Sequence, residues 1–398
     1  MHRNIAAIVG QNENGILAYQ SQAFMDLLRP FGFVGHVVDL ARPGWQEVLN
    51  QAVQGGLVFA WGYAGIGSGI KVGDRNLWDA LDVGYVAVHA DTPCAMPSNH
   101  FVKARRVANG YVFRDWLGMH RRFLRSPQIT GMLPMGVIPN RWRDKVPWAK
   151  REHRMVFLKT GADPEARRAK WAGWGTRLQA ALEDAAAQLC RRGTGDITAT
   201  ALASLEANGL FIEERKDLLF GLLLELDQYV RAVRATTMAR ALRDIPALII
   251  GAGWEHVSAE AGRARFLPAA PADGIDELYA NCQWLVNTTP NFSSGTHERV
   301  LRGFAAKSCV VSDDNDFTRE RLHGLPSYRG VEWHAPDLAE RLAAIYHDPS
   351  PFDDVLLQPA LSYVEREHDP LAFMKAVMEL AEVTCLKGLD QFLPEPAA

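Results

Sequence analysis

The sequence contains few cysteines, and none of them has the spacing that cysteine chemistry requires. The five are Cys94, Cys190, Cys282, Cys309 and Cys385, an odd number without any C-x-x-C pair. This pattern argues against a disulfide framework and against a zinc cluster. We therefore expect reduced thiols and predict that no metal is bound.

Long hydrophobic runs and an excess of charge of either sign are also missing. No apolar run approaches the roughly 18 residues of a membrane span, and the apolar stretch after Met1–Asn4 is shorter than a signal-peptide core. The 43 basic and 46 acidic side chains give a net charge of -3. The chain is therefore no polycation of the kind that coats nucleic acid. We expect a cytoplasmic protein without a nucleic-acid partner.

What the sequence does contain is enough apolar material for two α/β domains. Of its 398 residues 48% are hydrophobic, and short β-branched runs alternate with amphipathic stretches. This alternation is typical of parallel sheets. We predict an N-terminal domain over residues 1–145, a second over 146–375 with a helical insertion over about 165–243, and a C-terminal helix and tail over 376–398. The predicted strands are 5–9, 33–38, 56–60, 85–90, 155–158, 247–250, 283–287 and 309–312.

A basic tract joins the two predicted domains. Between Lys103 and Arg154 thirteen Lys or Arg residues face only Asp115, Asp144 and Glu152. Prolines and tryptophans in this tract indicate a linker. Its charge predicts a local basic surface that could contact an anionic acceptor or a membrane. The aromatic pattern of RNA-binding modules is missing from it.

The loop after the predicted strand 283–287 is the most informative candidate site. It reads Asn287-Thr-Thr-Pro-Asn-Phe-Ser-Ser-Gly-Thr-His-Glu-Arg299 and leads into a helix for which Ser294 or Thr296 could be the N-cap. Gly295 permits close approach of a backbone. Arg299 places a cation in the first turn, where a helix favours an acid, so a bound anion such as a diphosphate is expected. An ordinary capped helix with solvated side chains is the alternative.

Acidic residues follow the next predicted strand. Asp313 to Asp316 would lie at the same edge of the sheet as the Asn287 loop, and Asp314-Asn315-Asp316 has the form D-x-D that holds a divalent metal in some sugar-transferring folds. A polar turn between strand and helix is the simpler interpretation, because Asp and Asn favour turns.

Three residues of the N-terminal domain are candidates for a catalytic base. Asp91 directly follows the predicted strand 85–90, His100 lies in the loop beyond it, and Glu13 lies in a glycine-bounded loop after the first strand. A carboxylate or a neutral imidazole at such a position could deprotonate an acceptor hydroxyl. Asp91 is the best placed of the three. A turn-capping Asp91 is the structural alternative.

Several common enzyme signatures are missing. Gly251-Ala252-Gly253 lacks the third glycine of a dinucleotide fingerprint, the loop after the first strand lacks the Lys of a P-loop, and no G-x-S-x-G or H-E-x-x-H occurs. These absences count against dehydrogenases, P-loop kinases, serine hydrolases and zinc proteases.

The remaining pattern resembles the C-terminal half of bacterial GT-B glycosyltransferases of group 1, especially the spore-maturation-like branch. The resemblance is carried by Gly251-Ala252-Gly253-Trp254, by Asn287 through Val300, and by Val310-Val311-Ser312-Asp313. It implies two Rossmann-like domains facing a cleft and a nucleotide-sugar donor without a further cofactor. The implied donor-binding residues are Gly251, Trp254, Asn287, Ser293, Gly295, Thr296, His297, Glu298, Arg299 and Asp313.

Two positions depart from the group 1 pattern. Arg302 stands where these enzymes often carry a donor-contacting glutamate, and Lys307 stands where they carry glycine. Sequence reasoning therefore predicts a glycosyltransferase whose sugar and acceptor are open. The acceptor could be a glycan, a lipid-linked molecule or a protein, and it could be anionic. The alternatives are a Rossmann-type oxidoreductase and a non-catalytic two-lobed binding protein.

Overall fold

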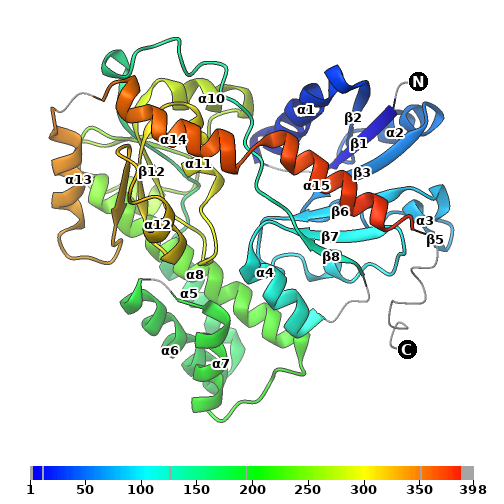
Figure 1. Cartoon of the computed structure of the whole chain (residues 1–398). Coiled ribbons are helices and arrows are strands. Elements are labelled where there is room, and N and C mark those ends of the chain that lie inside the picture. Colours follow the sequence, from blue (N-terminus) through cyan, green and yellow to red (C-terminus); the bar gives the residue numbers. More distant parts are fainter. Residues whose placement is uncertain (1–2, 11–12, 125–127, 194, 350–351, 387–398) are drawn as a thin grey trace. The chain divides into compact units, whose positions relative to one another are not determined.

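The chain forms two compact units in a computed structural model that describes residues 3–10, 13–124, 128–193, 195–349 and 352–386 (Figure 1). Unit 1 contains the chain up to Ile138 and again from Glu367, and unit 2 is Pro139–Arg366. The sequence had placed these divisions at 145 and 375. The difference arises because the last described helix, Pro370–Val383, packs on the first unit, where Phe373 lies 4.9 Å from Phe24 between ring centroids.

Unit 1 is built on a six-stranded parallel sheet of order β2-β1-β3-β6-β7-β8. Its strands are β1 Arg3–Val9, β2 Phe33–Asp39, β3 Leu57–Tyr63, β6 Gly84–His89, β7 Val107–Tyr111 and β8 Thr130–Met132, with a small hairpin of β4 Lys71–Val72 and β5 Arg75–Asn76. Its helices are α1 Ile16–Leu28, α2 Trp45–Gln54, α3 Leu77–Leu81, α4 Arg114–Met119 and α15 Pro370–Val383.

Unit 2 repeats this plan with the order β11-β10-β9-β12-β13-β14, again all parallel. Its strands are β9 His153–Leu158, β10 Leu248–Ile250, β11 Arg265–Leu267, β12 Cys282–Asn287, β13 Cys309–Asp313 and β14 Tyr328–Val331. Its helices are α5 Pro164–Ala169, α6 Thr176–Arg192, α7 Ile197–Ala207, α8 Lys216–Leu242, α9 Glu255–Ser258, α10 Ala272–Ala280, α11 Glu298–Ala305, α12 Asp316–Arg321, α13 Leu338–His347 and α14 Asp354–Glu367.

The strand order of unit 2 fixes where a ligand is expected. Counted along the chain, the order is 3-2-1-4-5-6, that of a doubly wound dinucleotide-binding sheet, and it reverses between β9 and β12. Ligands of such sheets bind beyond the carboxyl ends of the strands at this reversal. The residues that follow Leu158 and Asn287 are therefore the first place to look for a site.

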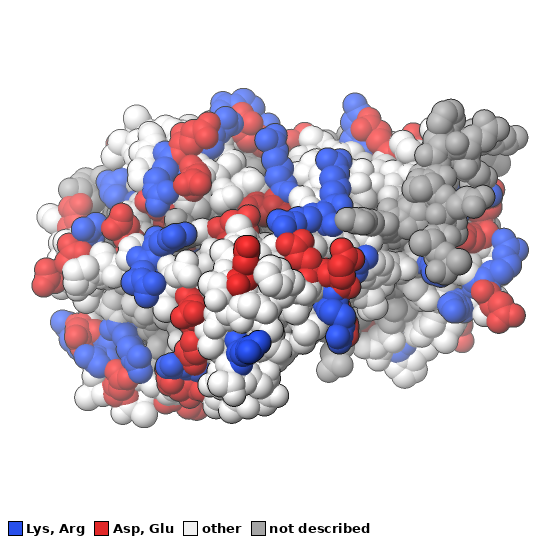
Figure 2. Space-filling view, turned by 90° about the horizontal axis from the view of Figure 1, so that it is seen from below, with Lys and Arg blue, Asp and Glu red and all other residues white. Residues whose placement is uncertain are grey.

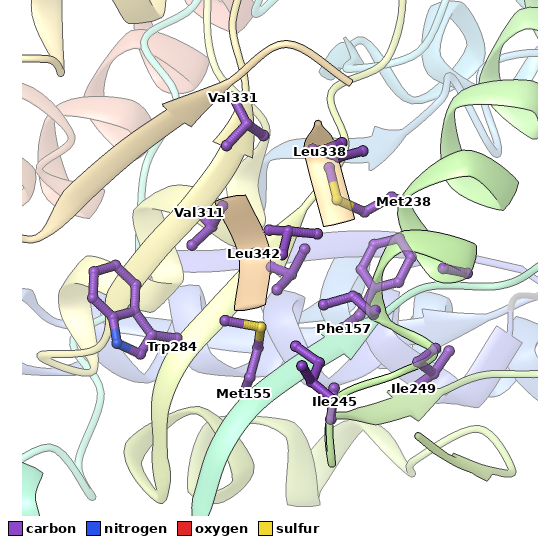
Figure 3. Packing of buried hydrophobic residues seen from close by; sticks show 14 of the residues in the cluster. Met155, Phe157, Met238, Ile245, Ile249, Trp284, Val311, Val331, Leu338 and Leu342 are labelled. Carbon is purple, nitrogen blue, oxygen red and sulfur yellow. The ribbon is translucent and has the colours of Figure 1, made fainter. Parts of the chain in front are cut away.

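One core of unit 2 lies between its sheet and α8 and α13. Met155, Phe157, Ile249 and Trp284 project from the strands and meet Met238 of α8 together with Leu338 and Leu342 of α13 (Figure 3). All of these side chains are at most 3% exposed. The C-terminal half of α8 thus belongs to the domain core, while α6, α7 and the N-terminal half of α8 form the insertion.

The predicted α/β class with two parallel sheets and a helical insertion is confirmed. The predicted helix Lys216–Leu242 coincides with α8. Six strands were missed: β7, β8, β11 and β14, which have three to five residues each, and the two-residue strands β4 and β5. Strands this short leave too little alternation to detect in a sequence.

The predicted basic linker requires correction. Residues 107–111, 114–119 and 130–132 of this tract are elements of unit 1. Arg106 and Arg151 are buried, Arg106 against Asp82 and the Thr384 carbonyl and Arg151 against the carbonyls of Cys282 and Ala306. On the face shown in Figure 2, Lys and Arg side chains are interspersed with Asp and Glu. Composition alone could not show that some of these cations form buried hydrogen bonds and ion pairs.

In unit 2 the loop after β10, which contains Gly251 and Gly253, packs backbone against backbone on the loop after β9, which contains Gly161. Gly253 has φ +78°, and a Cβ there would lie 2.4 Å from the Gly161 carbonyl oxygen. Gly209 has a similar φ of +70°, but nothing lies within 4 Å of its Cβ position. An Ala substitution at Gly209 therefore introduces backbone strain only, whereas one at Gly253 introduces backbone strain and a steric conflict.

We predict that Gly253→Ala destabilises unit 2 more than Gly209→Ala does. The left-handed backbone costs Ala roughly 1–2 kcal/mol at either position, and the contact with Gly161 adds overpacking of about 1–3 kcal/mol at Gly253 only. Urea unfolding of both variants measures the difference. Equal losses of unfolding free energy would contradict the tight loop packing.

Candidate functional site

Residues after β9 and β12 meet at the reversal point of the unit 2 sheet. The two strands are neighbours, with Val286 opposite Phe157. Lys159 directly follows β9, and the loop 288–297 directly follows β12. At the end of β12, Asn287 is fully buried and donates from Nδ2 to Ser312 Oγ over 2.9 Å. This bond leaves the Asn287 Oδ1 atom to hold a side chain of the following helix.

Arg299 is fixed in place by that amide oxygen. Its Nη1 donates to Asn287 Oδ1 over 2.9 Å, and within the described residues no carboxylate forms an ion pair with it. Burial lowers the pKa of Arg299 from its ordinary value, although a guanidinium stays charged at any neutral pH. The first turn of α11 therefore carries a positioned cation without a partner of opposite charge.

His297 is the N-cap of α11, in place of the predicted Ser294 or Thr296. It has extended backbone angles, and its Nδ1 accepts the backbone N–H of Arg299 over 3.1 Å. Burial, followed by the charges of Arg299 and Lys159, lowers the pKa of His297 well below its usual value. The ring is thus neutral with its proton on Nε2, which makes Nε2 a hydrogen-bond donor.

Lys159 is the second cation of the site. Burial lowers its pKa well below the ordinary value, followed by the charges of Arg299 and Arg231, while Asp313 opposes this effect. In the described part of the chain Lys159 Nζ has no hydrogen bond and no ion pair. Burial and the neighbouring guanidinium groups disfavour the charged form of Lys159, and a bound anion would favour it.

A buried arginine of α8, Arg234, contacts the loops that follow β12 and β13. Arg234 is 5% exposed and lies 3.3 Å from Asp313, which ends β13. It also donates to Asn291 Oδ1 over 2.9 Å and to the Thr289 carbonyl, and it stacks on Trp333. Asp313 in addition accepts the Thr289 backbone N–H over 2.6 Å. Asp313 therefore shapes the loop by holding Thr289 and Arg234.

The glycine loop after β10 has a packing role. The Gly251 Cβ position is 2.2 Å from the Lys159 carbonyl oxygen, so Gly251 lets this loop pass directly over Lys159. Trp254 is 3% exposed and donates from Nε1 to the same carbonyl over 2.8 Å. Gly251 and Trp254, which the resemblance implied as donor-binding residues, thus position the Lys159 segment, and the indole ring presents no open face.

The other predicted loop residues take several roles. The carbonyl of Gly295 accepts Asn315 Nδ2 over 2.9 Å, which fixes the loop to α12. Thr296 is 3% exposed, and its hydroxyl has no hydrogen-bond partner among the described residues. Ser293 is exposed at the loop tip, and Glu298 lies 3.9 Å from Arg302. Ser293, Gly295 and Thr296 thus belong to the loop that leads to Arg299, and Glu298 faces the next turn of α11.

The two positions that depart from the group 1 pattern have structural partners. Arg302 forms an ion pair with Asp276 of α10 at 2.8 Å. Lys307 has φ +54°, a left-handed conformation that favours glycine. Its ammonium group lies 2.6 Å from Asp144 and 3.1 Å from Asp354.

The acidic turn after β13 is internally satisfied. Asn315 caps α12 with a reciprocal bond to Thr318, and Asp314 accepts from Thr318, His323 and Tyr328. Asp316 pairs with Arg319. Within the described ranges no three His, Cys, Asp or Glu side chains are arranged to hold a metal ion.

The three candidate bases of unit 1 lie in different surroundings. Asp91 is exposed directly after β6, and its carboxylate is without hydrogen bond or ion pair in the part of the chain that is described. His100 is 2% exposed, and its Nδ1 is bonded to Tyr111 Oη over 2.6 Å. Glu13 begins a 3-10 turn, and its side chain lies outside the described residues. Of Asp91 and His100, whose side chains are described, only Asp91 combines exposure with an open carboxylate.

His100 belongs to a buried network that the sequence did not reveal. Tyr111 Oη also bonds His120 Nδ1 over 2.7 Å, and the rings of His89 and His100 stack at 3.9 Å. Burial lowers the pKa of His89 and of His120 to about 4 and that of His100 to about 2. All three rings are therefore neutral near pH 7.

Sequence reasoning missed Lys159 and Arg234 as members of the site. Lys159 directly follows a predicted strand, so the rule that placed Asn287 at the sheet edge could have placed it there too. Arg234 lies between Val230 and Met238 on the apolar face of α8. A single charge in an apolar stripe is the signal that marks it.

We predict that unfolding free energy falls as the pH drops below 6.5. Between pH 6.5 and 4 the unfolded histidines bind protons that the folded His89, His100 and His120 reject, so each costs up to about 1.4 kcal/mol per pH unit. His120→Gln should reduce the slope of unfolding free energy against pH, measured in urea. The control is His347→Gln, at an exposed position. An unchanged slope in His120→Gln would show that burial does not disfavour the charged form of His120.

No helix in the described ranges has the length and apolar character needed to cross a membrane. No protein-family model matches the sequence, and no curated protein matches it. Solved structures do match. A glycosyltransferase from Rickettsia africae covers 97% of this chain and 100% of its own at TM-score 0.51 and 9% identity. AviGT4, a glycosyltransferase involved in avilamycin A biosynthesis, covers 96% and 98% at 0.50 and 13%.

A third match is an alpha-glucosyltransferase solved with UDP and a 13-mer DNA, which covers 96% of this chain and 100% of its own at TM-score 0.52 and 10% identity. At such identities the likeness concerns the fold. The chain therefore has the GT-B fold, with two parallel six-stranded sheets flanked by helices.

Proposed function

We propose that the protein is a GT-B glycosyltransferase, in which unit 2 binds a nucleotide-sugar and a sugar passes from it to an acceptor hydroxyl. The observation that carries this proposal is that two basic side chains, Lys159 and Arg299, lie at the reversal point of the unit 2 sheet and form no ion pair within the described residues. A diphosphate supplies the negative charge that this place lacks. The similar alpha-glucosyltransferase was solved with UDP, which makes UDP the first nucleotide to test.

The cations assist bond cleavage as well as binding. When the bond between the sugar carbon and the phosphate oxygen breaks, negative charge grows on the diphosphate. Lys159, Arg299 and the Nε2–H of His297 are fixed before the reaction, so they stabilise this charge without reorganising. The same cations allow the reaction to proceed without a divalent metal, and this metal independence is part of the proposal.

The acceptor side of the reaction is assigned to unit 1. The acceptor oxygen bonds to the sugar carbon as the diphosphate leaves, and its proton passes to a base. Asp91 is the proposed base, because its exposed carboxylate lies at the carboxyl end of β6 without a partner among the described residues. His100 is less suited, since its Nδ1 is bonded to Tyr111 and burial lowers its pKa to about 2.

The finer sequence predictions belong to this proposal. Several finer points of the proposal rest on the sequence alone. They are membership of the spore-maturation-like branch, domains that face a cleft, a glycan or anionic acceptor, membrane contact and the lack of a nucleic-acid partner. The cytoplasmic location is supported by five free cysteines. Against an oxidoreductase, Gly251 and Gly253 are occupied by packing against the β9 loop.

We predict that Lys159→Met and Arg299→Ala each weaken nucleoside diphosphate binding by about tenfold or more, because each removes a charge-assisted hydrogen bond. A thermal-shift panel of UDP, GDP, ADP, dTDP, CMP and NAD selects the nucleotide, and calorimetry then gives its dissociation constant. Lys150→Met, an exposed change in the same unit, is the control. Stabilisation by NAD alone, or unchanged diphosphate affinity in both variants, would refute the proposal.

A further inference from the structure

The side-chain amide of Asn287 lies between a guanidinium group and a hydroxyl. Asn287 ends β12 beside Ser312 of β13, its partner in the parallel sheet, and both residues are 0% exposed. Side chains of paired residues in neighbouring strands project to the same face. Asn287 Oδ1 accepts from Arg299 Nη1, and Asn287 Nδ2 donates to Ser312 Oγ, each over 2.9 Å. Both ends of the amide are therefore bonded.

The orientation of this amide is set by its partners. A guanidinium has donors only, so the amide oxygen must face Arg299 and the amide nitrogen must face Ser312. The Ser312 hydroxyl accepts this N–H and donates its own proton toward Asp313, whose carbonyl oxygen lies 3.2 Å and whose Oδ1 lies 3.4 Å away. A flipped amide would turn its N–H groups toward the guanidinium. Ser312 thus keeps the oxygen of Asn287 on Arg299.

Aspartate has nearly the same shape as asparagine, but it would act differently at position 287. A carboxylate there would form an ion pair with Arg299, and burial would leave this pair little screened. The positive charge of Arg299 would then be compensated within the protein. A carboxylate would also compete with Asp313 for the single proton of the Ser312 hydroxyl. A neutral acceptor, in contrast, holds Arg299 and leaves its charge for a ligand.

Arg234 shows the compensated arrangement at the neighbouring strand end. Its guanidinium pairs with Asp313 at 3.3 Å, and both side chains are at most 6% exposed. Arg299 is bonded to an amide oxygen instead, and it forms no ion pair within the described residues. Two adjacent strand ends therefore hold one arginine each, β13 with a carboxylate and β12 with an amide.

We propose that Asn287 and Ser312 are positioning residues that fix Arg299 at the diphosphate site while its charge stays uncompensated. Neither residue needs to touch the donor, because both act through the guanidinium. The inference rests on the proposed function, since it requires an anion that binds Arg299. It replaces the donor contact that the resemblance implied for Asn287, and it assigns a role to Ser312.

The test compares Asn287→Asp with Asn287→Leu, two changes of similar size. Urea unfolding shows whether each variant folds, and calorimetry with UDP, or with the diphosphate that the thermal-shift panel selects, gives the dissociation constant. Asn287→Leu removes the acceptor but leaves the charge, so affinity should fall by about threefold. Asn287→Asp keeps an acceptor but compensates the charge, so affinity should fall by about tenfold or more.

A merely structural role of Asn287 gives the reverse order, because Asp still holds the guanidinium and Leu does not. Affinity in Asn287→Asp equal to or above that in Asn287→Leu would therefore overturn the proposal.

A double-mutant cycle locates the effect at Arg299. Arg299→Ala should weaken diphosphate binding by about tenfold or more in the wild-type background, but by about threefold or less in the Asn287→Asp background, where the charge is already compensated. Equal losses in the two backgrounds would show that the carboxylate acts elsewhere, and the proposal would fail.

Ser308 provides a matched control for Ser312. Both serines are at most 1% exposed and lie near opposite ends of β13, where Ser308 Oγ donates to the Tyr279 carbonyl over 2.6 Å. Ser312→Ala should weaken diphosphate binding by about threefold or more, because the amide is free to turn, whereas Ser308→Ala should lower stability alone. Equal affinities would contradict the role of Ser312.

The serine pair also tests the proposal if a change at Asn287 prevents folding. Failure of the wild-type protein to bind any nucleoside diphosphate would instead overturn the proposed function. Binding that is strong in wild type and unaffected by Asn287→Asp and Ser312→Ala would overturn only the positioning role, so the two failures are distinguishable.

Discussion

The buried ion pair between Arg234 and Asp313 is the interaction on which the proposed site depends. It joins α8, which continues the helical insertion into the core, to the end of β13, and the same guanidinium holds the Thr289 carbonyl and Asn291. A buried pair gains little net stability, but loss of one partner is costly because the other charge stays buried. Its value here is geometric, since it fixes the loop after β12 relative to the insertion.

A second constraint follows from the first. With the loop fixed, Asn287 holds Arg299 and His297 caps α11, while the glycine loop after β10 holds Lys159. Two basic side chains thus lie at one sheet edge, where burial and the neighbouring guanidinium groups disfavour the charged form of Lys159. Like charges at such a place repel each other, and the anion proposed to bind there would relieve this cost. The instability of the empty site is a consequence of its preorganisation.

Unit 1 has a different chemistry at the same edge of its sheet. There the buried groups are neutral, and Tyr111 links two histidines whose charged forms are disfavoured by burial. Unit 2 places basic side chains at its sheet edge, whereas unit 1 has an exposed carboxylate, Asp91, and a network of uncharged rings. The two similar sheets thus present different chemistry at corresponding edges.

The sequence predicted the parts of the protein that depend on local pattern. The longer strands, helix α8 and the loop from Asn287 to Arg299 were found because hydrophobic period, turn residues and a first-turn cation act within a few residues of the chain. The polar turn that contains Asn315 was also predicted, because Asp and Asn residues adjoin in the sequence there. The position of Arg299 in the first turn of a helix was also predicted before any contact was known.

Tertiary structure alone decided how these parts are used. Arg234 meets Asp313 across a separation in sequence that no local pattern records, and Lys159 becomes a site residue only because β9 pairs with β12. Arg106 and Arg151 form internal hydrogen bonds instead of contributing to a basic surface, and Trp254 bonds the Lys159 carbonyl. Sequence fixes which chemical groups are available, but strand order and burial determine which of them remain unpaired, and the unpaired groups are those that can bind a ligand.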